Sequence, residues 1–226
     1  MWFQQGLCLL PVILVVSSSS TFIISYVIAV TRQDVDVILP YISDTADSPP
    51  ESCFFGLMTL VSAIAGICTI YAMYGYLAKV GEKTGRVSLC WNKAALGLGL
   101  LSCFGMCVVA TFQESAVRIV HLAGALLFFL CGTLYISVET YLSYCSSPYG
   151  ASLFTCHTRL TLSLISVVAF FPTVICKCFD KDPHLQKISA GCEWIVAFSF
   201  VCYFLTYIHD FKRFNLNVQI VCGTGN

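Results

Sequence analysis

Two carboxylates inside long apolar segments are the first candidates for chemistry in this chain. Of its 24 Lys, Arg, Asp and Glu residues, only Glu139 and Glu193 fall well inside an apolar stretch. A charged group in hydrocarbon is costly, so an acid at such a position is a functional hypothesis by default. Two carboxylates close together would indicate general acid–base catalysis.

The depth of each acid argues against such a pair. If both termini face the cytosol, the fourth and sixth apolar segments run in the same direction. At about 1.5 Å per helical residue, Glu193 lies about 9 Å from the far side and Glu139 about 30 Å, so they differ by about 20 Å. Nearer partners are available. The sequence predicts a His121–Glu193 contact toward the lumen and a Glu139–Arg159 pair toward the cytosol.

The alternative for both pairs is purely structural, because buried polar groups often serve to fix the packing of a bundle. No Gly-x-Ser-x-Gly elbow and no His-Glu-x-x-His helix is present, and the four histidines are scattered. The 14 cysteines show no paired zinc spacing. We therefore expect a protein that is not an enzyme, with no metal and no cofactor. A formal net charge of zero gives no basic field for nucleic acid.

Six apolar stretches must position these side chains. A bilayer core takes about 20 helical residues to cross, and its interior forces such stretches to be helical. The mean hydropathy of +0.82 and the 11% of charged residues agree. We predict an all-α fold: a polytopic membrane protein, a bundle of six transmembrane helices forming one membrane domain over residues 1–226. The predicted spans are residues 7–30, 54–77, 94–112, 118–142, 160–179 and 188–208.

Small and hydroxylated residues within the spans predict close helix contacts. Residues 17–21 are four serines and a threonine in the middle of the first span, and they should face other helices. In the third span, Ala95, Gly99 and Cys103 follow one another at four-residue spacing, which lets helix backbones approach closely. We expect tight packing within the bundle there, with a dimer seam as the alternative. The oligomeric state stays open.

The first polar gap, residues 31–53, is acidic and rich in proline. It holds five acids against Arg32, and three prolines favour an irregular but ordered loop over a helix. We expect Tyr41, Ser43 and Asp44 to form a lumenal lid near His121 and Glu193. The alternative is that this segment merely caps the second span. An acidic lumen would protonate His121 more often, which could produce a pH response.

The basic residues give an orientation. With both termini in the cytosol, seven Lys and Arg residues lie on the cytosolic side and five on the other. Gap 78–93 supplies most of this margin with four of the seven. We predict cytosolic termini.

Several strings of this chain resemble those of a known family. Residues 39–45 read Leu-Pro-Tyr-Ile-Ser-Asp-Thr, and residues 49–52 read Pro-Pro-Glu-Ser. The last span reads Cys-Glu-Trp-Ile-Val-Ala-Phe over residues 192–198 and leaves through residues 204–211. With further agreement at residues 104–106, 110–114 and 120–125, the chain resembles the damage-regulated autophagy modulators. These belong to the wider Frag1/DRAM/Sfk1 group of six-span proteins.

The resemblance implies a multi-pass lysosomal or endosomal membrane protein that promotes autophagy under stress and can favour cell death. It implies no catalytic residue. Relatives in the wider group act in lipid-anchor remodelling and phosphoinositide kinase regulation, so membrane lipids and other membrane or autophagy proteins are the expected partners. One alternative is a lipid-handling protein, namely a scramblase, transporter or lipid-remodelling factor. A transporter coupled to protons or amino acids, with Glu193 on a water-filled path, is a further alternative.

Overall fold

The computed structural model describes residues 2–178 and 182–212, and the elements in these ranges are helical. The six long helices are α1 (Trp2–Thr31), α2 (Glu51–Thr84), α3 (Leu89–Thr111), α4 (Arg118–Ser146), α5 (Leu153–Cys178) and α6 (Pro183–Leu205). Two short helices, η1 (Asp44–Ala46) and α7 (Tyr207–Phe211), complete the set. Six segments are long and apolar enough to cross a membrane, which confirms the predicted fold class.

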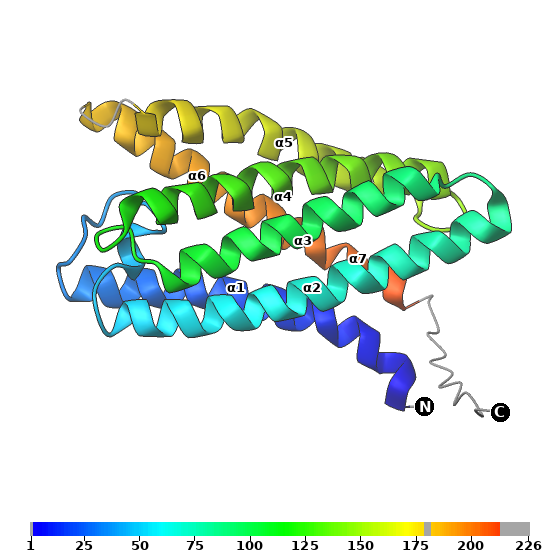
Figure 1. Ribbon diagram of the computed structural model, residues 1–226, viewed down its shortest axis with the longest axis horizontal. Coiled ribbons are helices and arrows are strands. Elements are labelled where there is room, and N and C mark those ends of the chain that lie inside the picture. The colour runs from blue at the N-terminus through cyan, green and yellow to red at the C-terminus, as the bar shows by residue number, and fades with distance from the viewer. Residues whose placement is uncertain (1, 179–181, 213–226) are drawn as a thin grey trace, which may run out of the picture.

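Consecutive helices form three hairpins, α1–α2, α3–α4 and α5–α6. Helix α6 runs obliquely across the bundle and also contacts α1, so the hairpins form a closed bundle (Figure 1). The loop before α2, the α3–α4 turn and the start of α6 lie at one end of the bundle. We call it the loop end. Helix α1 begins and α7 ends at the opposite end, as an even number of crossings requires (Figure 1).

Helix boundaries follow local chemistry. Helix α2 runs well beyond the predicted residue 77 and stops at Gly85, which adopts a left-handed φ of 65° and donates its N–H to the Gly81 carbonyl at 2.8 Å. Helix α6 begins with Pro183, whose missing N–H costs nothing in the first turn. The Asp182 side chain accepts the N–H of His184 at 2.9 Å.

Buried hydroxyls and exposed apolar side chains give the bundle the pattern expected in a bilayer. Ser17, Ser18 and Thr21 are buried against other helices, and the Ser17 and Ser62 hydroxyls lie 2.7 Å apart. Ser19 and Ser20 are only half-buried, so the prediction is confirmed for three of the five hydroxylated residues at the centre of the first span. Large apolar residues such as Ile64 cover the outside instead. Hydrocarbon replaces water around them, so they need no burial.

Candidate functional site

The loop before α2 is held in place at the loop end by α6. The Trp194 indole N–H donates to the carbonyl of Pro40 at 2.8 Å. The backbone N–H of Ile42 donates to the Glu193 carboxylate at 3.2 Å. The predicted lid is therefore an ordered segment that packs against α6. The buried Glu193 carboxylate accepts a hydrogen bond from its backbone.

Glu114, in the turn between α3 and α4, is the centre of a polar cluster at the loop end. Its Oε2 accepts from the Lys177 ammonium at 2.9 Å and from the Ser43 hydroxyl at 3.0 Å. His121 Nε2 lies 3.8 Å from the same oxygen, and Arg118 Nε lies 3.9 Å from Oε1. Burial by itself would raise the pKa of the Glu114 carboxyl, but Lys177 and the hydrogen bonds outweigh burial and hold it below its usual value.

His121 does not use the partner predicted for it. Its Nδ1 lies 2.6 Å from the carbonyl oxygen of Phe112 and donates a hydrogen bond to it, because a carbonyl oxygen only accepts. Its other nitrogen faces Glu114, whereas Glu193 bonds the N–H of Ile42. The predicted His121–Glu193 contact is therefore wrong. His121 and Glu193 line the same cavity, but the residue that His121 faces at 3.8 Å is Glu114 in the α3–α4 turn.

An apolar cavity of about 330 Å³, here called the inner cavity, lies below this cluster. All six long helices contribute to its wall, with side chains such as Phe22, Phe55 and Phe129. Its polar residues are Tyr41, Ser43, Thr59, His121, Thr173, Lys177 and Glu193. The cavity is thus lined mainly by apolar side chains, and its polar side chains come from the lid and the helix ends.

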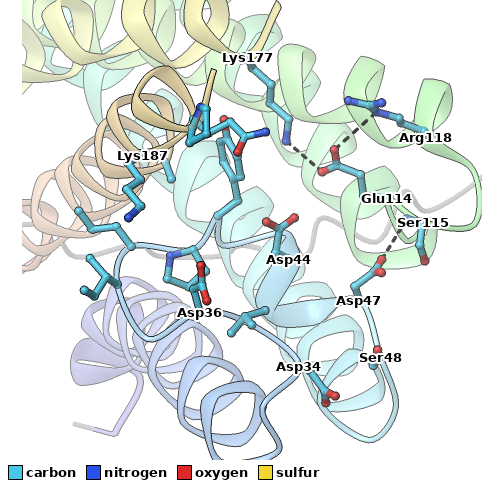
Figure 2. Close-up of a pocket in the computed structure, with 18 residues that line it drawn as sticks. Asp34, Asp36, Asp44, Asp47, Ser48, Glu114, Ser115, Arg118, Lys177 and Lys187 are labelled. Carbon is cyan, nitrogen blue, oxygen red and sulfur yellow. Dashed lines mark hydrogen bonds and ion pairs between the residues drawn. The ribbon is translucent and has the colours of Figure 1, made fainter. Parts of the chain in front are cut away.

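A second and more polar hollow of about 700 Å³, here called the outer basin, lies between the loop, the α3–α4 turn and the start of α6. Figure 2 shows Asp34, Asp36 and Asp44 around it, with Lys177 reaching across to Glu114. Its charged lining residues are Asp34, Asp36, Asp44, Asp47, Glu114, Arg118, Lys177 and Lys187. Five carboxylates against three cationic side chains make the basin acidic.

The opposite end of the bundle holds a separate buried charge cluster. Arg159 is 2% exposed, and its guanidinium donates to Asp210, to the Thr206 hydroxyl at 2.8 Å and to the Ser143 hydroxyl at 2.7 Å. Its ion pair is with Asp210, so the predicted Glu139–Arg159 pair is wrong. Glu139 lies near enough to interact with both charges electrostatically, but its buried Oε2 has no hydrogen-bond partner among the described residues.

The structure also shows what the sequence reasoning missed. Three charged residues of these clusters lie at the ends of apolar segments: Glu114, Lys177 and Asp210. A charged residue at such a position is normally interpreted as a solvent-exposed loop residue. Arg159, which we counted among the cytosolic charges, is buried inside the bundle. Arg213, also counted on the cytosolic side, and Lys181, counted on the far side, lie outside the described residues.

The fold and the geometry of the loop end together identify the class of protein. This is a multi-pass membrane protein with an ordered polar lid over an apolar cavity between the helices. Residues 6–214 match the family model described as the Frag1/DRAM/Sfk1/Cwh43P N-terminal domain. The chain belongs to this family.

Named relatives agree with this assignment. The chain is 43% identical to DNA damage-regulated autophagy modulator protein 1 of Homo sapiens, over 96% of each chain. It is 40% identical to DNA damage-regulated autophagy modulator protein 2 of Rattus norvegicus, covering 96% of this chain and 88% of the relative. It is 28% identical to the modulator of macroautophagy TMEM150B of Danio rerio, over 96% and 90%. No solved structure shows significant similarity to this chain.

Proposed function

We propose that this protein is a lysosomal or endosomal membrane protein that modulates autophagy and stress-induced cell death. It acts by binding a membrane lipid or a partner protein at its loop end, and not by catalysis. Relatives named as autophagy modulators support the first part, because they match nearly the whole chain. The inner cavity with its polar lid carries the second part, because ligand pockets combine apolar walls with a few placed polar groups.

The lid is the surface on which a partner or lipid would act. It bonds α6 through the N–H of Ile42 and the carbonyl of Pro40, and it bonds the α3–α4 turn through the Ser43 hydroxyl, so these contacts hold its position. A molecule that enters the inner cavity must pass the lid or contact it. Binding there would therefore alter the face that the protein presents to the lumen.

A depletion and rescue experiment tests the proposed role. We expect cells lacking the protein to show reduced autophagic flux after genotoxic stress, measured with and without a block of lysosomal degradation. The wild-type chain should restore the flux and colocalise with a lysosomal membrane marker. Rescue by Trp194→Phe, which removes the indole N–H that holds Pro40, should be weaker than rescue by Trp91→Phe. Trp91 is exposed on α3 and serves as the matched control. An unchanged flux after depletion would contradict the proposal.

Lipid handling is the second candidate, and the inner cavity favours it. The cavity shares Phe22, Met106 and Phe128 with a smaller hollow of about 60 Å³ that reaches further into the bundle. A scramblase or lipid transporter would move a fluorescent lipid between leaflets of liposomes that contain the purified protein. Liposomes with protein that show the transfer rate of empty liposomes would argue against this candidate.

A further inference from the structure

A buried threonine in the wall of the inner cavity points to a ligand. Thr59, on α2, is 6% exposed and lines the cavity. Its Oγ1 has no hydrogen-bond partner among the described residues. Every other threonine in the described part of the chain uses its hydroxyl in a hydrogen bond. A buried hydroxyl without a bond is costly and rare, so Thr59 calls for a polar atom inside the cavity.

The helical position of Thr59 makes its lack of a bond unusual. Within a helix, a threonine hydroxyl can donate to the backbone carbonyl four residues earlier. Thr69 bonds Ala65 in this way at 2.7 Å on the same helix. Thr173, in the same cavity wall, bonds Ala169 at 2.9 Å. Thr59 departs from this pattern, so its hydroxyl is left for a molecule that occupies the cavity.

The charged residues of the cavity wall favour an uncharged molecule. Lys177 and Glu193 contribute one charge of each sign. The Lys177 ammonium already donates to Glu114 at 2.9 Å, and the Glu193 carboxylate accepts the N–H of Ile42 at 3.2 Å. A charged ligand would therefore give up its hydration to face charges that are already engaged, which is unfavourable in an apolar space.

The size of the inner cavity limits the ligand to a compact or single-chain molecule. Its volume is about 330 Å³. A dry cavity of about 150 Å³ holds a benzene molecule in a well-studied protein core, so this one is roughly twice as large. Lipid tails are as apolar as the cavity wall, so a pure hydrocarbon gains little by leaving the bilayer. The polar atom that meets Thr59 therefore decides which molecule is bound.

We propose that the inner cavity binds an uncharged lipid alcohol, whose apolar body fills the cavity and whose oxygen accepts a hydrogen bond from Thr59. The inference rests on the lipid interaction proposed above and names the chemical class of its ligand. An alcohol oxygen accepts the Thr59 proton and, unlike a carboxylate or an ammonium, brings no charge into the cavity. Thr59 lies about 12 Å along α2 from its start at Glu51, so the bound oxygen lies inside the bundle.

Photolabelling in lipid nanodiscs tests the inference. The probe is 1-dodecanol with a diazirine in its chain, and dodecane with the same diazirine is the comparison. We expect saturable labelling by the alcohol, mapped by mass spectrometry to cavity-lining residues such as Met106 and Leu122. Labelling by dodecane at the same mole fraction in the bilayer should be about fivefold lower, which corresponds to the loss of one hydrogen bond.

A threonine-to-valine pair locates the oxygen. Thr59→Val keeps the shape of the side chain and removes the hydroxyl, so labelling by the alcohol should fall to the level of dodecane. Thr161→Val makes the same change at an exposed position of α5 and should preserve the preference for the alcohol. Removing an unpartnered buried hydroxyl costs the protein no hydrogen bond. The unfolding midpoint of Thr59→Val without probe should therefore equal or exceed that of the wild type.

An alanine-to-leucine pair locates the apolar body. Ala125→Leu adds bulk to the cavity wall and should reduce saturable labelling by the alcohol. Ala123→Leu adds the same bulk at an exposed position of α4 and should leave labelling unchanged.

Three outcomes would overturn the inference. A preference for the alcohol that is absent in the wild type, or that survives Thr59→Val, would contradict the hydroxyl contact, while the proposed lipid interaction would stand. Stronger saturable labelling of the cavity by dodecylamine or dodecanoic acid with the same diazirine would contradict an uncharged ligand. Absence of saturable labelling by any of these probes, together with an autophagic flux that still depends on the protein, would reject the ligand and leave the modulator role intact.

Discussion

At the scale of single residues, a few buried charges in this bundle have their partners fixed by short hydrogen bonds. In a low-dielectric interior a charge without compensation is very costly, so an opposite charge or several hydrogen-bond donors stabilise it. Arg159 meets this need with Asp210 and two hydroxyls. Glu114 meets it with Lys177 and Ser43 at the other end. These two sets of contacts anchor α7 and the lid.

Removing the buried guanidinium should strongly destabilise the bundle. Arg159→Met leaves the Asp210 carboxylate buried without its ion pair, which costs about 3–5 kcal/mol. Thermal unfolding in detergent micelles should show a clear fall in midpoint, and adding Asp210→Asn should recover part of it. Arg86→Met serves as the control because Arg86 is exposed. An equal effect of both single variants would mean that the cluster does not stabilise the protein.

The ionised Glu114 carboxylate should contribute to the free energy of unfolding, and this contribution should be lost at acidic pH. Its pKa is lowered in the folded state despite burial, because Lys177 and the hydrogen bonds favour the charged form. Such a carboxylate stabilises the fold above its unfolded pKa of about 4.3, and this contribution disappears as the pH falls through the lower folded value.

The measurement is the unfolding midpoint as a function of pH for the wild type and Glu114→Gln. We expect the wild type to be the more stable above about pH 4.3 and the difference to shrink below it. Glu82→Gln, at the opposite end of the bundle, should follow the wild type. A constant difference across the whole pH range would exclude this role for Glu114.

At the scale of helices, close approach of α3 and α4 depends on glycines at one crossing. A Cβ atom added to Gly105 would lie 2.5 Å from the backbone nitrogen of Phe128 and 2.7 Å from the Gly124 carbonyl oxygen. Backbone cannot move aside as a side chain can, so the two helices would have to separate. The small residues of the third span therefore pack within the bundle, as expected, although Gly97 has open space around its Cα.

Two glycine variants of α3 test this packing. Gly105→Ala should lower the free energy of unfolding by about 1–3 kcal/mol, the usual cost of overpacking. Gly97→Ala meets no atom within 4 Å, so it should leave stability unchanged or raise it by up to about 1 kcal/mol through helix propensity. Unfolding of both variants in the same detergent provides the comparison. An equal loss of unfolding free energy in both variants would indicate that the close approach of α3 and α4 at Gly105 does not determine stability.

At the scale of the whole molecule, the hairpin arrangement places every feature of the loop end on one side of the membrane. With six crossings, α1 begins where α7 ends (Figure 1). The lid and the outer basin then lie at the end of the bundle opposite to the start of α1 and the end of α7. Orientation decides whether the proposed site meets the lumen or the cytosol.

Glycosylation mapping tests the orientation. The chain has no natural Asn-x-Ser/Thr sequon, so any glycan reports on an inserted one. A sequon inserted between Asp34 and Ile38 should be glycosylated, and one inserted between Gly85 and Ser88 should not. The reason is the predicted cytosolic position of the basic α2–α3 connection. The reverse pattern would place the termini in the lumen.

The sequence by itself predicted six long apolar helices, because the length and the hydropathy of a segment are local properties of the chain. It also placed Tyr41, Ser43 and Asp44 in an ordered loop near Glu193 and His121. Only the tertiary structure decided the partners. Glu114 rather than Glu193 meets His121, and Asp210 rather than Glu139 meets Arg159. The position of a residue along a helix follows from counting residues in one segment. Which side chains meet depends on how the helices are rotated against one another and on the shape of the turns between them, and no single segment determines that.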